Sequence, residues 1–218
     1  DVIAKIIIAA PGGYEMVDDI RFGGSLADLT FYESEAAFRD ASGTLLLEDF
    51  AEAPVADNMI TLCSEPLDGA TNQPGCFAPG DILPGISLQT EKSLYLGCPA
   101  CMLLYGKMTG FANTTPMLGV YSPDLLEVSF SDRVDFVGMT VYGTPLISVY
   151  GTDGTLLGSA VNSISASPIS PMDFWGVVAK KPIGRITISG SMLDDIMFGA
   201  RFPWAMFLPA IHGAAANP

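Results

Sequence analysis

The sequence predicts an all-β protein: an antiparallel β-sandwich, with a jelly roll as the leading variant, and one short helix. Short runs of apolar and β-branched residues recur between clusters of turn residues along most of the 218-residue chain. Only one stretch has a convincing helical pattern, and no low-complexity linker interrupts residues 94–200. Many short strands with so little helix are typical of a sandwich.

The first part of the chain after residue 24 is predicted to hold a strand, the helix and a second strand, at Leu29–Tyr32, Ser34–Asp40 and Thr44–Phe50. Ser34 is a suitable N-cap, because its hydroxyl can accept a hydrogen bond from a free amide of the first helical turn. Residues 51–93 are rich in Pro, Gly, Asn and Asp, which predicts two or three short strands among long loops.

The second part of the chain is predicted to be strands separated by turns. These strands are Leu94–Leu96, Met102–Tyr105, Leu118–Tyr121, Leu126–Ser131, Val134–Tyr142, Leu146–Tyr150, Thr155–Val161, Phe174–Ala179, Ile183–Ser189 and Leu193–Phe198. The clearest turn is Asp153-Gly154, because Asp-Gly supplies the positive φ angles that a tight hairpin turn requires.

Nearly the same nine residues occur twice, as MVDDIRFGG at 16–24 and as MLDDIMFGA at 192–200. The preceding residues also correspond, and each copy consists of two β-branched runs joined by a turn, which predicts a hairpin. Self-similar segments indicate repeat architecture. We therefore expect a closing hairpin of a preceding repeat or a strand-donating arm at 1–24, the jelly-roll sandwich at 25–200 and an apolar tail at 201–218. The alternative is a pseudo-symmetric pair of hairpins within one domain.

The charge and hydropathy of the chain exclude two kinds of partner. It has 24 acidic and 10 basic residues, and the net charge of −14 repels nucleic acid and anionic lipid. No apolar run reaches the roughly 18 residues that a membrane-spanning helix needs, so no membrane insertion is expected. A hydrophobic content of 49% is sufficient for a substantial core.

The four cysteines are Cys63, Cys76, Cys98 and Cys101. Their even number and the acidic composition predict an extracellular or cell-surface protein with two disulfides. Of three possible pairings, Cys63–Cys76 with Cys98–Cys101 is favoured because these cysteines are nearest in sequence. Cys98-Pro-Ala-Cys101 also has the spacing of a redox motif, but the residues after it predict a strand instead of the required helix. Zinc is disfavoured because only one CxxC pair is present.

Two carboxylates are predicted to point inward. Strand alternation places Asp194 on the same face as Ile196, and Glu48 on the same face as Phe50. A buried carboxylate needs hydrogen bonds or a cation, and calcium prefers oxygen ligands in irregular geometry. The sequence therefore predicts a structural calcium ion shared by Glu48 and Asp194.

The adjacent acids Asp49 and Asp195 complete the candidate ligand set for this calcium ion. The alternative is that the two inward carboxylates accept hydrogen bonds from backbone amides, or from the side chains of Arg133 or Arg185.

Five short motifs occur in strand order: LLLEDF at 45–50, VDFVGMTVYG at 134–143, ISVYGTDGTLLGSA at 147–160, FWGVVAKKPIGRITISG at 174–190 and LDDIMFG at 193–199. Together they resemble the galactose-binding-like jelly rolls of carbohydrate-binding modules and of bacterial surface proteins with PEP-CTERM sorting tails, over about 150 residues. The resemblance implies a calcium ion between an early Glu and an Asp of the final strand, here Glu48 and Asp194. The chain departs from this pattern in its four-cysteine loop and in residues 203–218, which lack a hydrophobic helix with a basic end.

The sequence favours a non-catalytic function. The only histidine, His212, lies in a Gly- and Ala-rich tail, so a Ser-His-Asp or Cys-His arrangement is not expected. A hairpin without its own sandwich leaves an open edge that can pair with a neighbouring copy or a tandem repeat. We therefore expect a structural or adhesive module that assembles by strand exchange. The alternative is glycan binding, with Tyr142, Tyr150 and Trp175 as candidate stacking residues, although aromatics in such apolar strands are usually core or half-buried.

Overall fold

The computed structural model describes residues 28–43, 45–64, 66–90, 100–109, 113–121, 124–161 and 172–201. The predicted hairpin at 1–24, the predicted strand at Leu94–Leu96 and the tail after Arg201 lie outside the described residues. Within them the protein is mostly antiparallel β-sheet with one short helix, which confirms the predicted all-β class. The elements are β1 (Leu29–Tyr32), α1 (Glu35–Ser42), β2 (Leu46–Glu48), β3 (Ile60–Ser64), β4 (Leu67–Asp68), β5 (Ile86–Thr90), β6 (Cys101–Tyr105), β7 (Met117–Gly119), β8 (Leu125–Tyr142), β9 (Leu146–Gly151), β10 (Leu156–Val161), β11 (Met172–Ser189) and β12 (Met192–Gly199).

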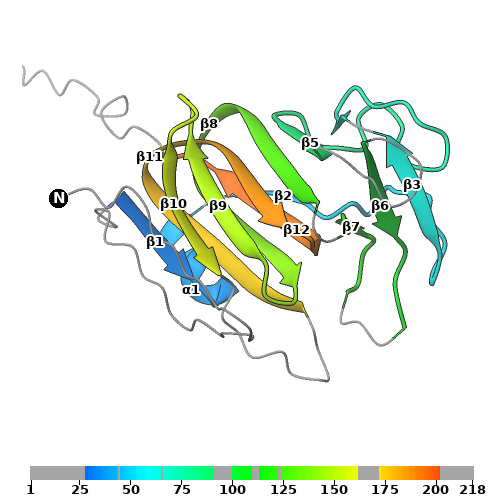
Figure 1. The fold of residues 1–218 in the computed structure, drawn as a ribbon, viewed down its shortest axis with the longest axis horizontal. Helices are drawn as coiled ribbons and strands as arrows, with labels where there is room; N and C mark the ends of the chain where they lie inside the picture. The colour runs from blue at the N-terminus through cyan, green and yellow to red at the C-terminus, as the bar shows by residue number, and fades with distance from the viewer. Residues whose placement is uncertain are drawn as a thin grey trace, which may run out of the picture.

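Two long strands, β8 and β11, organise the sheet and run side by side (Figure 1). They pair antiparallel from Tyr142 opposite Met172 to Leu125 opposite Ser189. The sequence predicted two strands in each of these stretches. The predicted breaks are instead irregularities within continuous strands, because the register shifts between Val178 and Arg185 while the backbone stays extended.

The halves of these long strands have different neighbours, which divides the sheet into two layers. The β12 layer contains β1, the first half of β11, the second half of β8 and β12, with β2 and β7 paired to β12. The β9 layer contains β10, β9, the second half of β11, the first half of β8 and β5. One hydrophobic cluster includes Val137 and Val177 of the first layer and Val149 and Ile186 of the second. The layers therefore share a core, and the finer assignment to a sandwich or a jelly roll stays a prediction.

Helix α1 packs on the face of the β12 layer that points away from this shared core. Its position and its cap agree with the prediction, since the Ser34 hydroxyl accepts a bond from the Ala37 amide at 3.4 Å. Phe38 is fully buried and forms a second hydrophobic cluster with Phe136 and Met197 of the strands below it. A single aromatic side chain thus anchors the helix to the sheet.

A pair of glycines makes room for Phe38. Gly138 and Gly176 lie directly opposite each other on β8 and β11, and a Cβ added to Gly138 would come within 2.7 Å of the Phe38 ring. We expect Gly138→Ala to lower the free energy of unfolding by about 1–3 kcal/mol, the usual range for overpacking. Thermal unfolding measures this loss, and the loss should shrink in a Phe38→Leu background. An unchanged melting temperature for Gly138→Ala would contradict the close approach.

A disulfide holds the loop after β3 against that strand. Cys63 and Cys76 are bonded, as predicted, and Cys101 is disulfide-bonded as well, whereas Cys98 lies outside the described residues. The side chain of Gln73 accepts a hydrogen bond from the Ser64 amide at 2.9 Å and donates one to the Ser64 carbonyl oxygen. This glutamine therefore covers part of the outer edge of β3 as a paired strand would.

The β9–β10 hairpin turns at Asp153-Gly154, as predicted, but by a different conformation. Gly154 has a positive φ of 78°, whereas Asp153 is not among the residues with positive φ. The Asp153 carboxylate instead accepts bonds from the Thr155 amide at 3.0 Å and from its hydroxyl at 2.6 Å. The expectation that both turn residues adopt positive φ was wrong, because this side-chain arrangement forms the turn with one glycine.

Candidate functional site

Glu48 is buried on the face of the β12 layer that it shares with Phe50, as predicted. Its carboxylate accepts bonds from the backbone amides of Phe50 at 2.8 Å and Leu83 at 2.7 Å. Burial raises the pKa of Glu48, and these two amides partly offset that effect. Backbone amides therefore supply the partners that the alternative interpretation of this residue predicted.

Asp194 is also buried, but strand alternation predicted its face wrongly. The register of β12 on β8 shifts just after Asp194, where Asp195 adopts a positive φ of 54°. Because of this irregularity Leu193 shares the core face with Ile196, and Asp194 lies opposite Thr140 on the face that carries α1. An extra residue in a strand reverses which face the side chains before it point to. The sequence of the motif gives no sign that Asp195 is such a residue.

The two carboxylates that were predicted to share a calcium ion therefore lie on opposite faces of the same layer. Glu48 pairs with Ile196 and faces the shared core, whereas Asp194 faces the helix side. Among the described residues, no group of three or more His, Cys, Asp or Glu side chains is arranged to hold a metal ion. Calcium binding stays a prediction, and the geometry does not bring its two principal ligands together.

Asp194 has two local partners. Its carboxylate accepts a bond from the Thr115 hydroxyl and one from the Asp195 amide, both at 2.9 Å. Burial raises the pKa of Asp194 from 3.8 to about 7, and the negative charges of Asp195 and Asp49 add to this rise. The Thr115 contact joins segments 79 residues apart, so no local sequence signal could have found it.

Asp195 stands in the same acidic environment. Burial raises its pKa, as do the charges of Asp49 and of Glu35 on α1, whereas Arg39 of the same helix lowers it. Three of the four predicted metal ligands, Asp49, Asp194 and Asp195, are thus electrostatic neighbours. The charge of Asp49 also raises the pKa of the fourth, Glu48, which lies on the core face. Asp194 and Asp195 therefore hold their protons more tightly than ordinary aspartates do.

The three aromatic residues predicted for ligand stacking lie in three different places. Trp175 is only 3% exposed and packs in the shared core, 5.9 Å from Phe31 between ring centroids. Tyr142 is at the end of β8 in the β12 layer. Tyr150 lies on β9 in the other layer, where the Arg185 guanidinium covers its ring at 4.4 Å. The structure therefore does not unite these residues in one binding surface.

A polar network surrounds Tyr150 on the outward face of the β9 layer. Arg185 donates a hydrogen bond to Glu127 at 2.6 Å. Glu127 also accepts bonds from Gln89 at 2.7 Å and from Ser129 at 3.0 Å. Arg185 was predicted only as a partner for a buried acid, and no sequence motif pointed to Gln89, Glu127 or Ser129. These residues come from three strands, so their proximity could have been predicted only if the strand pairing had been known.

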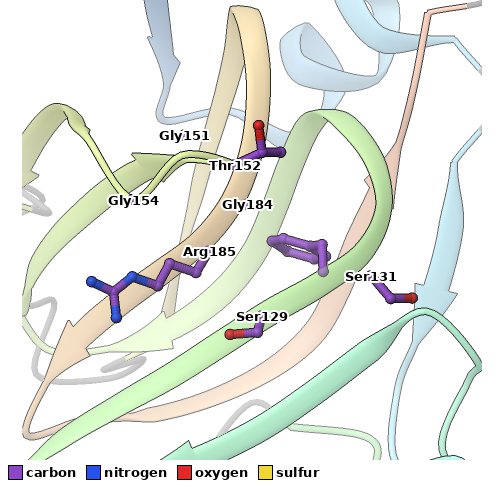
Figure 2. Close-up of a pocket in the computed structure, with 8 residues that line it drawn as sticks. Ser129, Ser131, Gly151, Thr152, Gly154, Gly184 and Arg185 are labelled. Carbon is purple, nitrogen blue, oxygen red and sulfur yellow. The ribbon is translucent and has the colours of Figure 1, made fainter.

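An open pocket of about 440 Å³ adjoins this network (Figure 2). It is lined by residues from three strands and a turn: Ser129, Phe130, Ser131, Gly151, Thr152, Gly154, Gly184 and Arg185. The glycines bring the chains close, because a Cβ on Gly184 would lie 2.8 Å from the Gly151 carbonyl oxygen. The pocket sits where β8 and β11 pass from one layer to the other.

Comparisons of the chain with protein-family models, with curated proteins and with solved structures find no match. The resemblance to galactose-binding-like jelly rolls is therefore neither supported nor opposed by a relative. None of the helical segments in the described ranges has the length and hydropathy that crossing a membrane requires.

Proposed function

We propose that this chain is a non-catalytic extracellular module with a structural or adhesive role, and that copies of it assemble edge to edge through strand β10. The observation that carries the proposal is the composition of this strand. β10 is the terminal strand of the β9 layer and, among the described strands, it pairs with β9 alone. Its six residues, LLGSAV, include no charge and no proline.

Terminal strands in monomeric proteins usually carry charges, prolines or bulges that prevent pairing with another molecule. β10 has one irregularity, between Leu156 and Gly158, but its remaining residues follow the ladder of β9. A chain with a net charge of −14 repels its own copies over most of its surface. An uncharged strand edge is therefore where two copies approach at the lowest electrostatic cost.

The properties of β3, the strand at the opposite end of the sheet from β10, support the choice of β10. β3 also pairs with one strand among those described, and Ile60 and Leu62 on it are exposed. However, Gln73 occupies both backbone groups of Ser64, and the Cys76 sulfur lies 3.3 Å from the Leu62 carbonyl oxygen. These contacts obstruct strand addition at β3.

Two further features support an extracellular and non-catalytic role. The Cys63–Cys76 disulfide is compatible with an oxidising compartment. The sequence has one histidine, and the buried acids Glu48 and Asp194 face opposite sides of a layer, so they cannot act as a catalytic pair.

Sedimentation velocity over a wide concentration range tests the assembly. We expect the unmodified chain to form dimers or longer species, and Ser159→Glu, which places a charge on exposed β10, to weaken association at least tenfold, or about 1.4 kcal/mol. Leu62→Glu is the matched control, since it adds the same charge to an exposed position of the obstructed strand β3. A monomeric unmodified chain, or equal effects of the two variants, would refute assembly through β10.

A further inference from the structure

The outward face of the β9 layer is rich in hydroxyl and amide groups. Register places these side chains next to one another across the strands, and the Ser148 and Ser159 hydroxyls lie 2.9 Å apart. The polar side chains on this face include Ser87, Gln89, Glu127, Ser129, Ser148, Tyr150, Ser159, Arg185 and Thr187. We call this surface the Arg185 face.

The centre of the Arg185 face is held rigidly. The Arg185 guanidinium is fixed by its 2.6 Å bond to Glu127 and by its position over the Tyr150 ring. Glu127 is itself fixed by Gln89 and Ser129. A guanidinium held in this way keeps further N–H donors in a fixed plane, and it loses little conformational entropy when it binds a ligand.

The charge of the Arg185 face indicates the ligand. In β5, β9, β10, residues 125–131 of β8 and residues 183–189 of β11, the only charged residues are Glu127 and Arg185, which pair with each other. On the neighbouring strand β4, Asp68 lies opposite Ser87. The rest of the face offers hydroxyls, which both donate and accept hydrogen bonds. An anion would be repelled by the chain as a whole. A cation would find the nearby carboxylates already engaged, since Glu127 pairs with Arg185, Asp68 accepts a bond from the Ala70 amide and Asp153 accepts one from the Thr155 hydroxyl.

We propose that the Arg185 face binds an uncharged polyhydroxylated chain, that is, a neutral glycan. The glycan lies across the strands, and one residue of it enters the pocket between Ser129, Thr152 and Arg185 (Figure 2). The volume of about 440 Å³ falls within the usual range for small-molecule sites. Arg185 and the serine hydroxyls contact the glycan, and Tyr150 is a positioning residue that holds the guanidinium plane. This site does not depend on the assembly through β10.

An array of neutral and acidic glycans, followed by calorimetry with the best neutral ligand, tests the site. We expect binding to neutral members and a loss of at least tenfold for Arg185→Lys, which keeps the charge beside Glu127 but removes the planar fork. Tyr150→Ala should weaken binding by a similar factor. Tyr150→Phe keeps the ring under the guanidinium and should bind as the unmodified chain does. Tyr142→Ala, on the other layer, is the control and should bind as the unmodified chain does.

Circular dichroism of each variant shows whether it is folded, so that a loss of binding by an unfolded protein is not counted. Because Arg185→Lys retains the ion pair, it provides a folded test even if Tyr150→Ala does not fold. Three outcomes would overturn the proposal: no glycan bound, acidic glycans bound in place of neutral ones, or neutral binding that Arg185→Lys leaves intact.

Discussion

Replacing Asp194 with asparagine should make the protein more stable by roughly 4 kcal/mol at about pH 8, with the difference vanishing near pH 4. The pKa of Asp194 is raised from 3.8 to about 7 by burial and by the charges of Asp195 and Asp49. A carboxyl with a raised pKa favours the folded state while it is protonated. Its stabilising effect is complete below pH 3.8 and is lost as the pH rises through about 7. The unmodified protein should therefore weaken over this interval.

Asparagine has the shape of the protonated acid and carries no charge. It can accept the bond from the Asp195 amide and donate to the Thr115 oxygen, so both contacts of residue 194 can be kept. Urea unfolding at several pH values measures the difference. Asp132→Asn is the control, because it removes the same charge from an exposed position on β8.

The same experiment tests the predicted calcium ion. If Asp194 binds calcium, adding the ion at about pH 8 should raise the melting temperature of the unmodified protein but not of Asp194→Asn, because a bound ligand stabilises only the state that binds it. If the acidic cluster acts only through its protons, calcium should have no effect on either protein. A gap between the two proteins that is independent of pH would contradict the raised pKa.

Removing the Cys63–Cys76 disulfide should cost about 3 kcal/mol, the entropic estimate for a loop of this length. The two cysteines are 13 residues apart, and the loop between them carries Gln73, which covers the edge of β3. The double variant Cys63→Ala/Cys76→Ala therefore should lose stability and also expose Ser64 on that edge. Guanidinium unfolding measures the first effect, and light scattering at rising protein concentration measures the second.

Gln73→Ala separates the two consequences of losing the disulfide. It leaves the bond in place but frees the Ser64 amide and carbonyl, so it should increase self-association with a smaller loss of stability. If the double variant unfolds at the same denaturant concentration as the unmodified protein, the bond does not constrain the unfolded chain. If neither change increases association, the edge of β3 is protected by something other than Gln73.

Much of the fold was predictable because its signals are local. The capping serine before α1, the apolar runs of β1, β9 and β12, and the Asp-Gly turn each act within a few residues. The bends in β8 and β11 were predicted as strand ends for a physical reason. Exposed polar residues at 131–133 look like a loop, although pairing with the neighbouring strand keeps the backbone extended there.

The candidate sites were harder to predict, because they depend on register. The burial of Glu48 and Asp194 followed from their apolar neighbours, and so did the face of Glu48. The face of Asp194 did not, since one irregular residue in β12 reverses the alternation. The network around Arg185 joins three strands that are far apart in the sequence. The sequence alone does not show that these residues are neighbours, because their proximity depends on the order of the strands in the sheet.

β10 is the edge strand of the β9 layer, and the outward surface of this layer carries Arg185. Two copies that pair antiparallel at this margin are related by a two-fold axis perpendicular to the sheet, so their outward surfaces look in the same direction. One long polymer could then occupy both at once. A bivalent platform of this kind can hold a polymer about 10²- to 10⁴-fold more tightly than either half alone, so weak individual contacts would be sufficient for lasting attachment.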